Sequence, residues 1–255
     1  MAMTDDDIAR YARHLVLKEI GGPGQQRLRA ARIFIVGAGG LGSPSALYLA
    51  AAGVGQLTIA DPDSVSLDNL QRQILFATGD VGASKVETAQ KRLSALNPGC
   101  SVATLEHAVT PENAAALFAG HDLVLDGTDS FETRFAVNDG CYAAGVPLLS
   151  GAVGRWDGQV AIFNAGKTRD RPASDRAPCY RCLVPDLPPD AETCARVGVV
   201  GALTGVIGSI MALEAIKWIT GAGQPLDGRV LFYDGLAAST RTVTLKPDPA
   251  CPVCG

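Results

Sequence analysis

Short apolar runs alternate with helical patterns along the first two thirds of the chain. Ile33–Val36 is an apolar, β-branched run that ends on the glycine-rich segment Gly37–Gly42, and a second apolar run, Leu57–Ala60, ends at Asp61. Between the two runs, Leu41, Leu47 and Leu49 stand among alanines at helical spacing. A strand, a glycine turn, a helix, a second strand and an acidic residue form the order of a nucleotide-binding βαβ unit.

The alternation continues toward the C-terminus. Further strands are predicted at Ser101–Leu105, Asp122–Asp126, Pro147–Ser150, Gln159–Phe163, Arg229–Tyr233 and Thr240–Leu245. Helices are predicted after a Thr4–Asp7 capping box, at Gln25–Ala30, at Lys85–Leu96, after Thr110–Pro111 and after Ser130. Alternating strands and helices predict an α/β fold: a doubly wound, Rossmann-like, mostly parallel sheet with helices on both faces, extended by C-terminal antiparallel strands.

The longest uncharged apolar run is Val197–Leu213. Its 17 residues stand at the lower limit for a membrane span, and Glu214 and Lys217 end it. We therefore expect a buried helix, packed closely through Gly201, Gly205 and its further glycines, and no membrane association.

Composition narrows the class of protein. The chain has 255 residues, of which 47% are hydrophobic and 19% charged, and its formal net charge is −4. These values favour one globular domain over a disordered chain, and they argue against a nucleic-acid binder. Within it we expect an N-terminal helical arm (1–30), a nucleotide-binding core (31–155) and a C-terminal part (156–255). The acidic first residues lack an apolar signal core, which predicts a cytoplasmic protein.

The glycine turn and Asp61 have separable physical roles. Glycine lets the chain turn sharply off a strand and lets backbone N–H groups approach an anion at the helix N-terminus. Asp61 can accept hydrogen bonds from a ribose at the end of the next strand. The competing interpretation is an ordinary tight turn in an α/β domain. The flanking strand and helix favour a nucleotide site, although they do not identify the nucleotide.

Four of the seven cysteines form two CxxC pairs, Cys179/Cys182 and Cys251/Cys254. Four thiolates suit a closed, structural zinc site that would tie the C-terminal tail to the long polar stretch 164–194. A redox dithiol and incidental thiols are the alternatives. Cys194 belongs to no pair, and its position before an apolar helix leaves a nucleophile and an inert thiol both open. Cys100 and Cys141 have the setting of packing residues.

Three charged residues would suit nucleotidyl transfer if the nucleotide is ATP. Such reactions depend on positioning and charge neutralisation more than on a general base. Arg72 and Lys85 are candidate cations after the second strand, and Asp129 is a candidate magnesium ligand after a later one. Each alone could be a solvated charge or a helix cap. Their common location at the carboxyl ends of the strands favours the functional interpretation.

A set of motifs now becomes recognisable across the chain. In order they are Gly37–Gly42, Asp61–Asp63, Ser66–Gln73, Gly82–Lys85, Asp126–Asp129, Cys179–Cys182, Thr193–Cys194 and Cys251–Cys254. Together they resemble the MoeB/ThiF family, relatives of the ubiquitin-activating enzymes, from Arg13 to Cys254. The resemblance implies ATP- and magnesium-dependent adenylation of the C-terminal glycine of a ubiquitin-like sulfur-carrier protein that ends in Gly-Gly. It also implies a homodimer. Because no sulfurtransferase domain follows Gly255 in this sequence, we expect a separate sulfur donor.

The resemblance also implies roles for individual residues. The glycine turn, with Gly37, Gly39, Gly40 and Gly42, would contact the nucleotide, and Asp61 would bind its ribose. The phosphates would be contacted by Asn69, Arg72 and Lys85, and magnesium would be held by Asp129. Arg13 would reach the triphosphate in the partner subunit, and the four paired cysteines would bind zinc. Cys194 matches a cysteine that in some members attacks the acyl-adenylate or joins sulfur transfer. The pathway stays open between molybdopterin, thiamin and tRNA thiolation.

Two other functions remain in competition. The glycine fingerprint and Asp61 also suit an NAD-dependent oxidoreductase, although no proton donor is evident near a hydride site. A zinc-containing scaffold could bind a ubiquitin-like tail without any chemistry.

Overall fold

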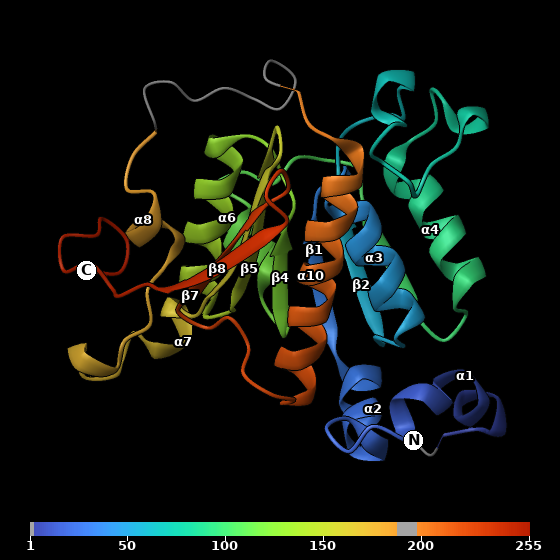
Figure 1. The fold of residues 1–255 in the computed structure, drawn as a ribbon, viewed down its shortest axis with the longest axis horizontal. Helices are drawn as coiled ribbons and strands as arrows, with labels where there is room; N and C mark the ends of the chain where they lie inside the picture. Colours follow the sequence, from blue (N-terminus) through green and yellow to red (C-terminus); the bar gives the residue numbers. More distant parts are fainter. Residues whose placement is uncertain (1–2, 188–197) are drawn as a thin grey trace.

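The computed structural model describes residues 3–187 and 198–255, and its centre is one eight-stranded sheet (Figure 1). The strands are β1 (Arg32–Val36), β2 (Gln56–Ala60), β3 (Ser101–Leu105), β4 (Leu123–Asp126), β5 (Leu148–Gly154), β6 (Asp157–Phe163), β7 (Arg229–Asp234) and β8 (Ser239–Thr244). Their order is β3-β2-β1-β4-β5-β6-β7-β8. The first five are parallel, and β6, β7 and β8 pair antiparallel. The predicted fold class is confirmed.

Helices cover the sheet and an N-terminal arm extends below it (Figure 1). The longer helices are α1 (Asp5–Leu15), α2 (Gly21–Ala30), α3 (Gly42–Ala51), α4 (Lys85–Leu96), α6 (Phe131–Ala144) and α10 (Gly201–Thr220). Shorter turns of helix are η1 (Leu67–Asn69), η2 (Thr78–Asp80), α5 (Ala114–Phe118), α7 (Ala165–Thr168), η3 (Ala173–Asp175) and α8 (Tyr180–Leu183).

The two faces of the sheet form separate cores because side chains alternate along each strand. Ile33 and Ile35 of β1 join the larger core with residues of α3, α4 and α10. Phe34 and Val36 join the smaller core with residues of α5, α6 and α8. The nucleotide-binding strands are therefore buried on both sides, as parallel sheets require.

One predicted helix boundary was wrong. Thr110–Pro111 does not cap α5, which begins at Ala114; Asn113 Oδ1 accepts a hydrogen bond from the Thr110 N–H and closes a turn there instead. The predicted buried helix is α10, which extends beyond the apolar run to Thr220. The Glu214 carboxylate is buried, but it accepts a hydrogen bond from the Leu226 N–H at 2.8 Å and pairs with Lys217.

Among the described residues, α10 alone is long and apolar enough to cross a membrane by length and composition. Its inward side packs against α3 and β5. Close packing through Gly208 brings it to α3: an added Cβ would lie 2.4 Å from Pro44 Cγ. The predicted close contact at Gly205 was wrong, since a Cβ there would meet no atom within 4 Å.

Candidate active site

A cavity of about 440 Å³ opens at the edge where the parallel strands end. The segments that line it follow neighbouring strands: His107–Val109 after β3, Asp61–Asp63 after β2, Gly37–Leu41 after β1 and Gly127–Asp129 after β4, with Val153 at the end of β5. Ligands of open α/β sheets bind at this edge. The strand order therefore also gives the order of the segments along the cavity.

The glycine turn after β1 forms the floor of the cavity. Gly37 has φ +89°, a conformation that side chains disfavour, and the Gly37 N–H donates to the Ala60 carbonyl at 2.8 Å. Gly42 begins α3, and an added Cβ there would lie 1.8 Å from the Gly37 carbonyl oxygen. Only glycine fits at this close approach, so the turn and helix are held tightly together.

Asp61 braces the same turn. Its carboxylate accepts hydrogen bonds from the Ala38 N–H at 2.8 Å and from the Asp63 N–H at 2.9 Å. Burial raises the pKa of Asp61, while the charge of Lys85 and these N–H donors oppose the rise. The residue predicted to hold a ribose therefore also fixes the backbone around the cavity.

Lys85 begins α4 and is only 4% exposed. Its Nζ lies 2.7 Å from an oxygen of Asp63 and 3.7 Å from one of Asp61. A buried ammonium needs such partners, because burying an unpaired charge is costly. The pair fixes Lys85 at the cavity wall, where Asp63 is the exposed partner.

Arg72 follows η1 and also lines the cavity. Its guanidinium donates to Asn69 Oδ1 and to the Asp68 carbonyl, the latter at 3.3 Å. Asn69 in turn donates to Ser66 Oγ. This network orients the planar donor group of an arginine, which suits phosphate oxygens.

Asp129 is an exposed acid of the cavity, and within residues 3–187 and 198–255 its carboxylate makes no hydrogen bond or ion pair. The loop beneath it is well held. Asp126 Oδ1 accepts from the Thr128 N–H and hydroxyl, and Arg134 donates to the Thr128 carbonyl at 2.6 Å. The free carboxylate thus stands on a rigid loop.

The cavity brings together most of the predicted site residues, namely Gly37, Gly39, Gly40, Asp61, Asn69, Arg72, Lys85 and Asp129. Gly42 lies behind the turn and does not line it. Arg13 is exposed on α1 and does not line the cavity of its own chain. Cys194 lies outside the described residues.

Several lining residues were not assigned from the sequence: Asp63, Asp68, Gln73, Thr133, Arg134, Val153, Val199 and Thr204. Asp63 and Gln73 stand within recognised motifs, so the motifs were the available signal. Arg134 lies in the first turn of α6, yet it is 7% exposed and reaches back to the cavity. Val199 and Thr204 come from the segment around the start of α10, whose location depends on tertiary packing.

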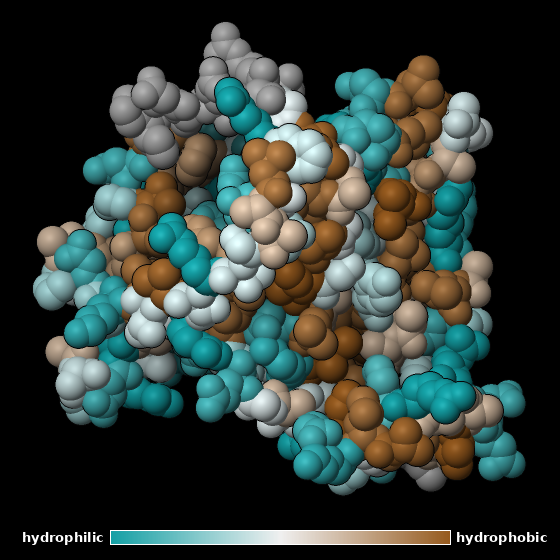
Figure 2. Space-filling view, in the orientation of Figure 1, coloured by the Kyte–Doolittle hydropathy of each residue, from teal (hydrophilic) through white to brown (hydrophobic). Residues whose placement is uncertain are grey.

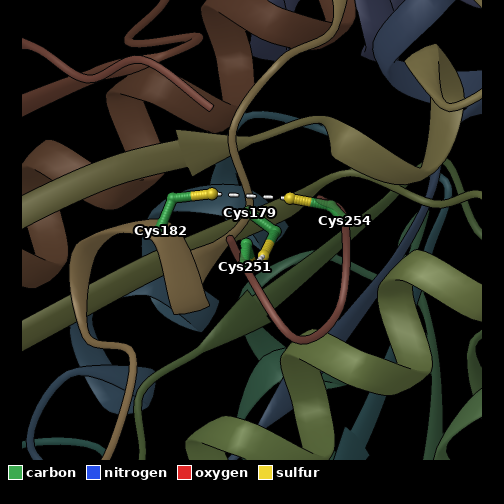
Figure 3. Close-up of side chains that lie close together, drawn as sticks. All are labelled: Cys179, Cys182, Cys251 and Cys254. Carbon is green, nitrogen blue, oxygen red and sulfur yellow. Dashed lines mark hydrogen bonds between the residues drawn. The ribbon is translucent and has the colours of Figure 1, made fainter. Parts of the chain in front are cut away.

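The two CxxC pairs meet in one cluster, as Figure 3 shows. All four sulfur atoms lie within 4.8 Å of one another, with Cys179 to Cys251 at 3.5 Å and Cys182 to Cys254 at 3.4 Å. Tetrahedral zinc with bonds of about 2.3 Å places its sulfur ligands about 3.8 Å apart. The cluster is therefore the right size for that metal, and it joins the C-terminal tail to α8, which has Cys179 as its N-cap and contains Cys182.

Hydrogen bonds move the thiol pKa values of the cluster in opposite directions. Those from Cys179 and Cys254 lower the pKa of the Cys182 thiol, and the Asp248 N–H donates to Cys182 Sγ at 3.4 Å. Hydrogen bonding with Cys182 and burial raise the pKa values of Cys179 and Cys254. Outside the cluster, burial raises the pKa of Cys100 to about 11 and also raises that of Cys141. Both are buried, which confirms their interpretation as packing residues.

The fold and the cavity define a nucleotide-binding α/β protein that carries a four-cysteine cluster. The model of the ThiF family matches residues 11–253, and the chain belongs to the ThiF family. The chain is 46% identical to the sulfur carrier protein adenylyltransferase of Thermus thermophilus, with 100% of this chain and 93% of the relative covered. It is 43% identical to the molybdopterin-synthase adenylyltransferase of Escherichia coli, with 99% and 98% covered.

Longer relatives and solved structures complete the comparison. The chain is 45% identical to the probable adenylyltransferase/sulfurtransferase MoeZ of Mycobacterium tuberculosis and spans 63% of its length. Among solved structures, Escherichia coli MccB with succinimide superimposes with a TM-score of 0.81 at 22% identity. That alignment covers 99% of this chain and 75% of MccB, and it shows the shared fold.

Proposed function

We propose that this protein uses ATP to adenylate the C-terminal glycine carboxylate of a ubiquitin-like sulfur-carrier protein. The observation that carries the proposal is the meeting of Arg72, Lys85 and Asp129 around the glycine turn in one cavity. The names of the related adenylyltransferases support the same chemistry.

The cavity residues suit this reaction step by step. Asp61 binds the ribose, and Arg72 and Lys85 contact the phosphates. A carboxylate oxygen of the carrier then forms a bond to the α-phosphorus, and the bond between that phosphorus and the bridging oxygen breaks. Pyrophosphate leaves with the electron pair. Because the attacking carboxylate is already an anion, the chain needs to supply charge neutralisation and alignment and no general base.

Asp129 would hold magnesium. Its unpaired, exposed carboxylate is a hard oxygen ligand of the kind that this ion takes in phosphate sites. The ion, when bound, neutralises charge on the phosphate oxygens. Zinc in the four-cysteine cluster would have no open position, so its role would be structural.

We also propose a homodimer in which Arg13 acts on the partner's cavity. Hydrophobic side chains gather over α10 in Figure 2. Among them, Val206 is 39% and Leu213 56% exposed, and Tyr48 on the adjoining α3 is 57% exposed. A surface of this kind is typical of subunit contacts. Arg13 itself is fixed to an arm whose Tyr11 hydroxyl meets Asn97 at 2.9 Å.

Pyrophosphate exchange into ATP tests the reaction directly. We expect exchange only when magnesium and a carrier ending in Gly-Gly are both present, and none with a carrier shortened by its last glycine. Absence of exchange with the sulfur-carrier proteins of both the molybdopterin and thiamin types would contradict the proposal.

The remaining functions are distinguished by titration. Tight binding of NADH with no binding of ATP would favour the oxidoreductase. Carrier binding without exchange would favour the scaffold.

A further inference from the structure

Gln73 has a buried side-chain amide that has no role in the proposed reaction as described above. The side chain lines the cavity and the residue is 4% exposed. Within the described part of the chain, its Oε1 atom has no hydrogen-bond partner. A buried acceptor without a donor is unfavourable, so such an atom in a ligand cavity indicates a donor on the ligand.

Gln73 lies between the glycine turn and the start of α10. Its Nε2 would lie 3.6 Å from a Cβ added at Gly39. The same segment packs against α10, because the Thr204 hydroxyl contacts the Arg72 carbonyl at 3.4 Å and a Cβ on Gly201 would clash with the Gln71 carbonyl. α10 in turn packs against β5. Gln73 therefore lies at the glycine turn itself, on a segment that α10 holds in place.

The nucleotide offers no donor at this place. Asp61, after β2, marks the ribose end, so the phosphates extend over the glycine turn after β1, and phosphate oxygens only accept hydrogen bonds from neutral and cationic groups. The attacking carboxylate must then approach from the β4 and β5 side. That wall includes Val153 and Val199, which are apolar and suit a glycine backbone.

We infer that Gln73 Oε1 accepts a hydrogen bond from the N–H of the last peptide bond of the carrier, between its two terminal glycines. This inference rests on the proposed function. The hydrogen bond would hold the terminal carboxylate in line with the α-phosphorus while Gln73 itself takes no part in bond making. Gln73 is thus a residue that positions the substrate, separate from the cations that contact ATP.

A double-mutant cycle between protein and substrate tests the inference. Gln73→Met keeps the length of the side chain and removes its amide. The probe is a ubiquitin-like sulfur carrier made by ligation in two forms, both of which end in a free carboxylate. In the amide carrier an ordinary peptide bond joins the two terminal glycines, and in the ester carrier an ester bond replaces that peptide bond and its N–H. Exchange rates at subsaturating carrier are measured for both proteins with both carriers. Gln71→Met, on the same segment but outside the cavity, is the matched control.

Loss of one neutral hydrogen bond corresponds to roughly a 3- to 10-fold fall in kcat/KM for the carrier. We expect this fall for the wild type with the ester carrier and for Gln73→Met with the amide carrier, and no further fall when both changes are combined. The ATP dissociation constant should stay unchanged, and Gln71→Met should match the wild type.

Independent, multiplying losses would overturn the inference, as would an unchanged rate of the wild type with the ester carrier. The wild-type measurement needs no variant, so it holds even if Gln73→Met fails to fold. A weakened ATP affinity in Gln73→Met would show instead that the amide contacts the nucleotide. Absence of exchange by the wild type with the amide carrier would reject the proposed function itself.

Discussion

The cavity and the four-cysteine cluster use polar groups in opposite ways. At the cavity, Asp129 is exposed and unpaired within the described residues, and Lys85 is held by acids that a ligand could displace. At the cluster, all four sulfur atoms face one another within 4.8 Å. Polar groups without a partner are typical of a site that acts on a ligand, whereas a complete set of metal ligands stabilises structure. The site of the proposed reaction and the site that cross-links the structure are therefore two different parts of the chain.

The largest expected effect of a single substitution is at Asp129. Asp129→Ala removes a charge-stabilising group and should lower the exchange rate by roughly 10²- to 10³-fold. Carrier binding, measured by calorimetry, should remain. Asp170→Ala, whose side chain is 97% exposed and outside the cavity, is the control. Equal rates for Asp129→Ala and the control would remove Asp129 from the reaction.

Substitution of Arg13 tests whether one subunit supplies all the catalytic residues of its own cavity. Arg13→Ala and Asp129→Ala should each be inactive alone, because each removes a group near the phosphates. If Arg13 acts in the partner's cavity, random mixing of subunits restores about a quarter of wild-type sites. Recovery is measured by exchange after denaturation and renaturation of the mixture. No recovery despite mixed dimers would place Arg13 on its own cavity, and full activity of Arg13→Ala alone would place it outside the reaction.

The cluster should affect stability more than activity. Cys254→Ser should release the metal and lower the melting temperature by roughly 5–15 °C, comparable with loss of a disulfide cross-link. ATP affinity should change little, since the cysteines do not line the cavity. Cys100→Ser is the control for a buried thiol outside the cluster. The metal content and the melting temperature are measured by metal analysis and calorimetry. Loss of ATP binding at temperatures where Cys254→Ser is folded would contradict the independence of the cluster and the cavity.

The smallest expected effects are changes in the free energy of unfolding on substitution of two glycines of α10. Gly208→Ala should cost roughly 2 kcal/mol, because its Cβ would clash with Pro44 and the Leu41 carbonyl beside the glycine turn. Gly205→Ala should stabilise by about 0.5–1 kcal/mol through helix propensity. Urea unfolding measures both. The reverse order would mean that α10 packs on α3 through a different face.

The strand-end pattern made most of the cavity predictable. Parallel strands bring their carboxyl ends to one edge, so the residues after Val36, Ala60 and Asp126 had to meet. The pairing of Asp63 with Lys85 was not predictable, because it depends on the irregular path of residues 62–84. Gln73 gave no signal of its own, since burial of an amide follows from the tertiary packing of its segment. The partners of the buried Glu214, at Leu226 and Lys217, were likewise not predictable from the end of the apolar run.

Isotope transfer tests the central claim most directly. The carrier is labelled with ¹⁸O at its terminal carboxylate, incubated with ATP and magnesium, and the product is cleaved with hydroxylamine. If the carboxylate attacks the α-phosphorus, one ¹⁸O atom appears in AMP and none in pyrophosphate. Label in inorganic phosphate, or AMP without label, would contradict the account.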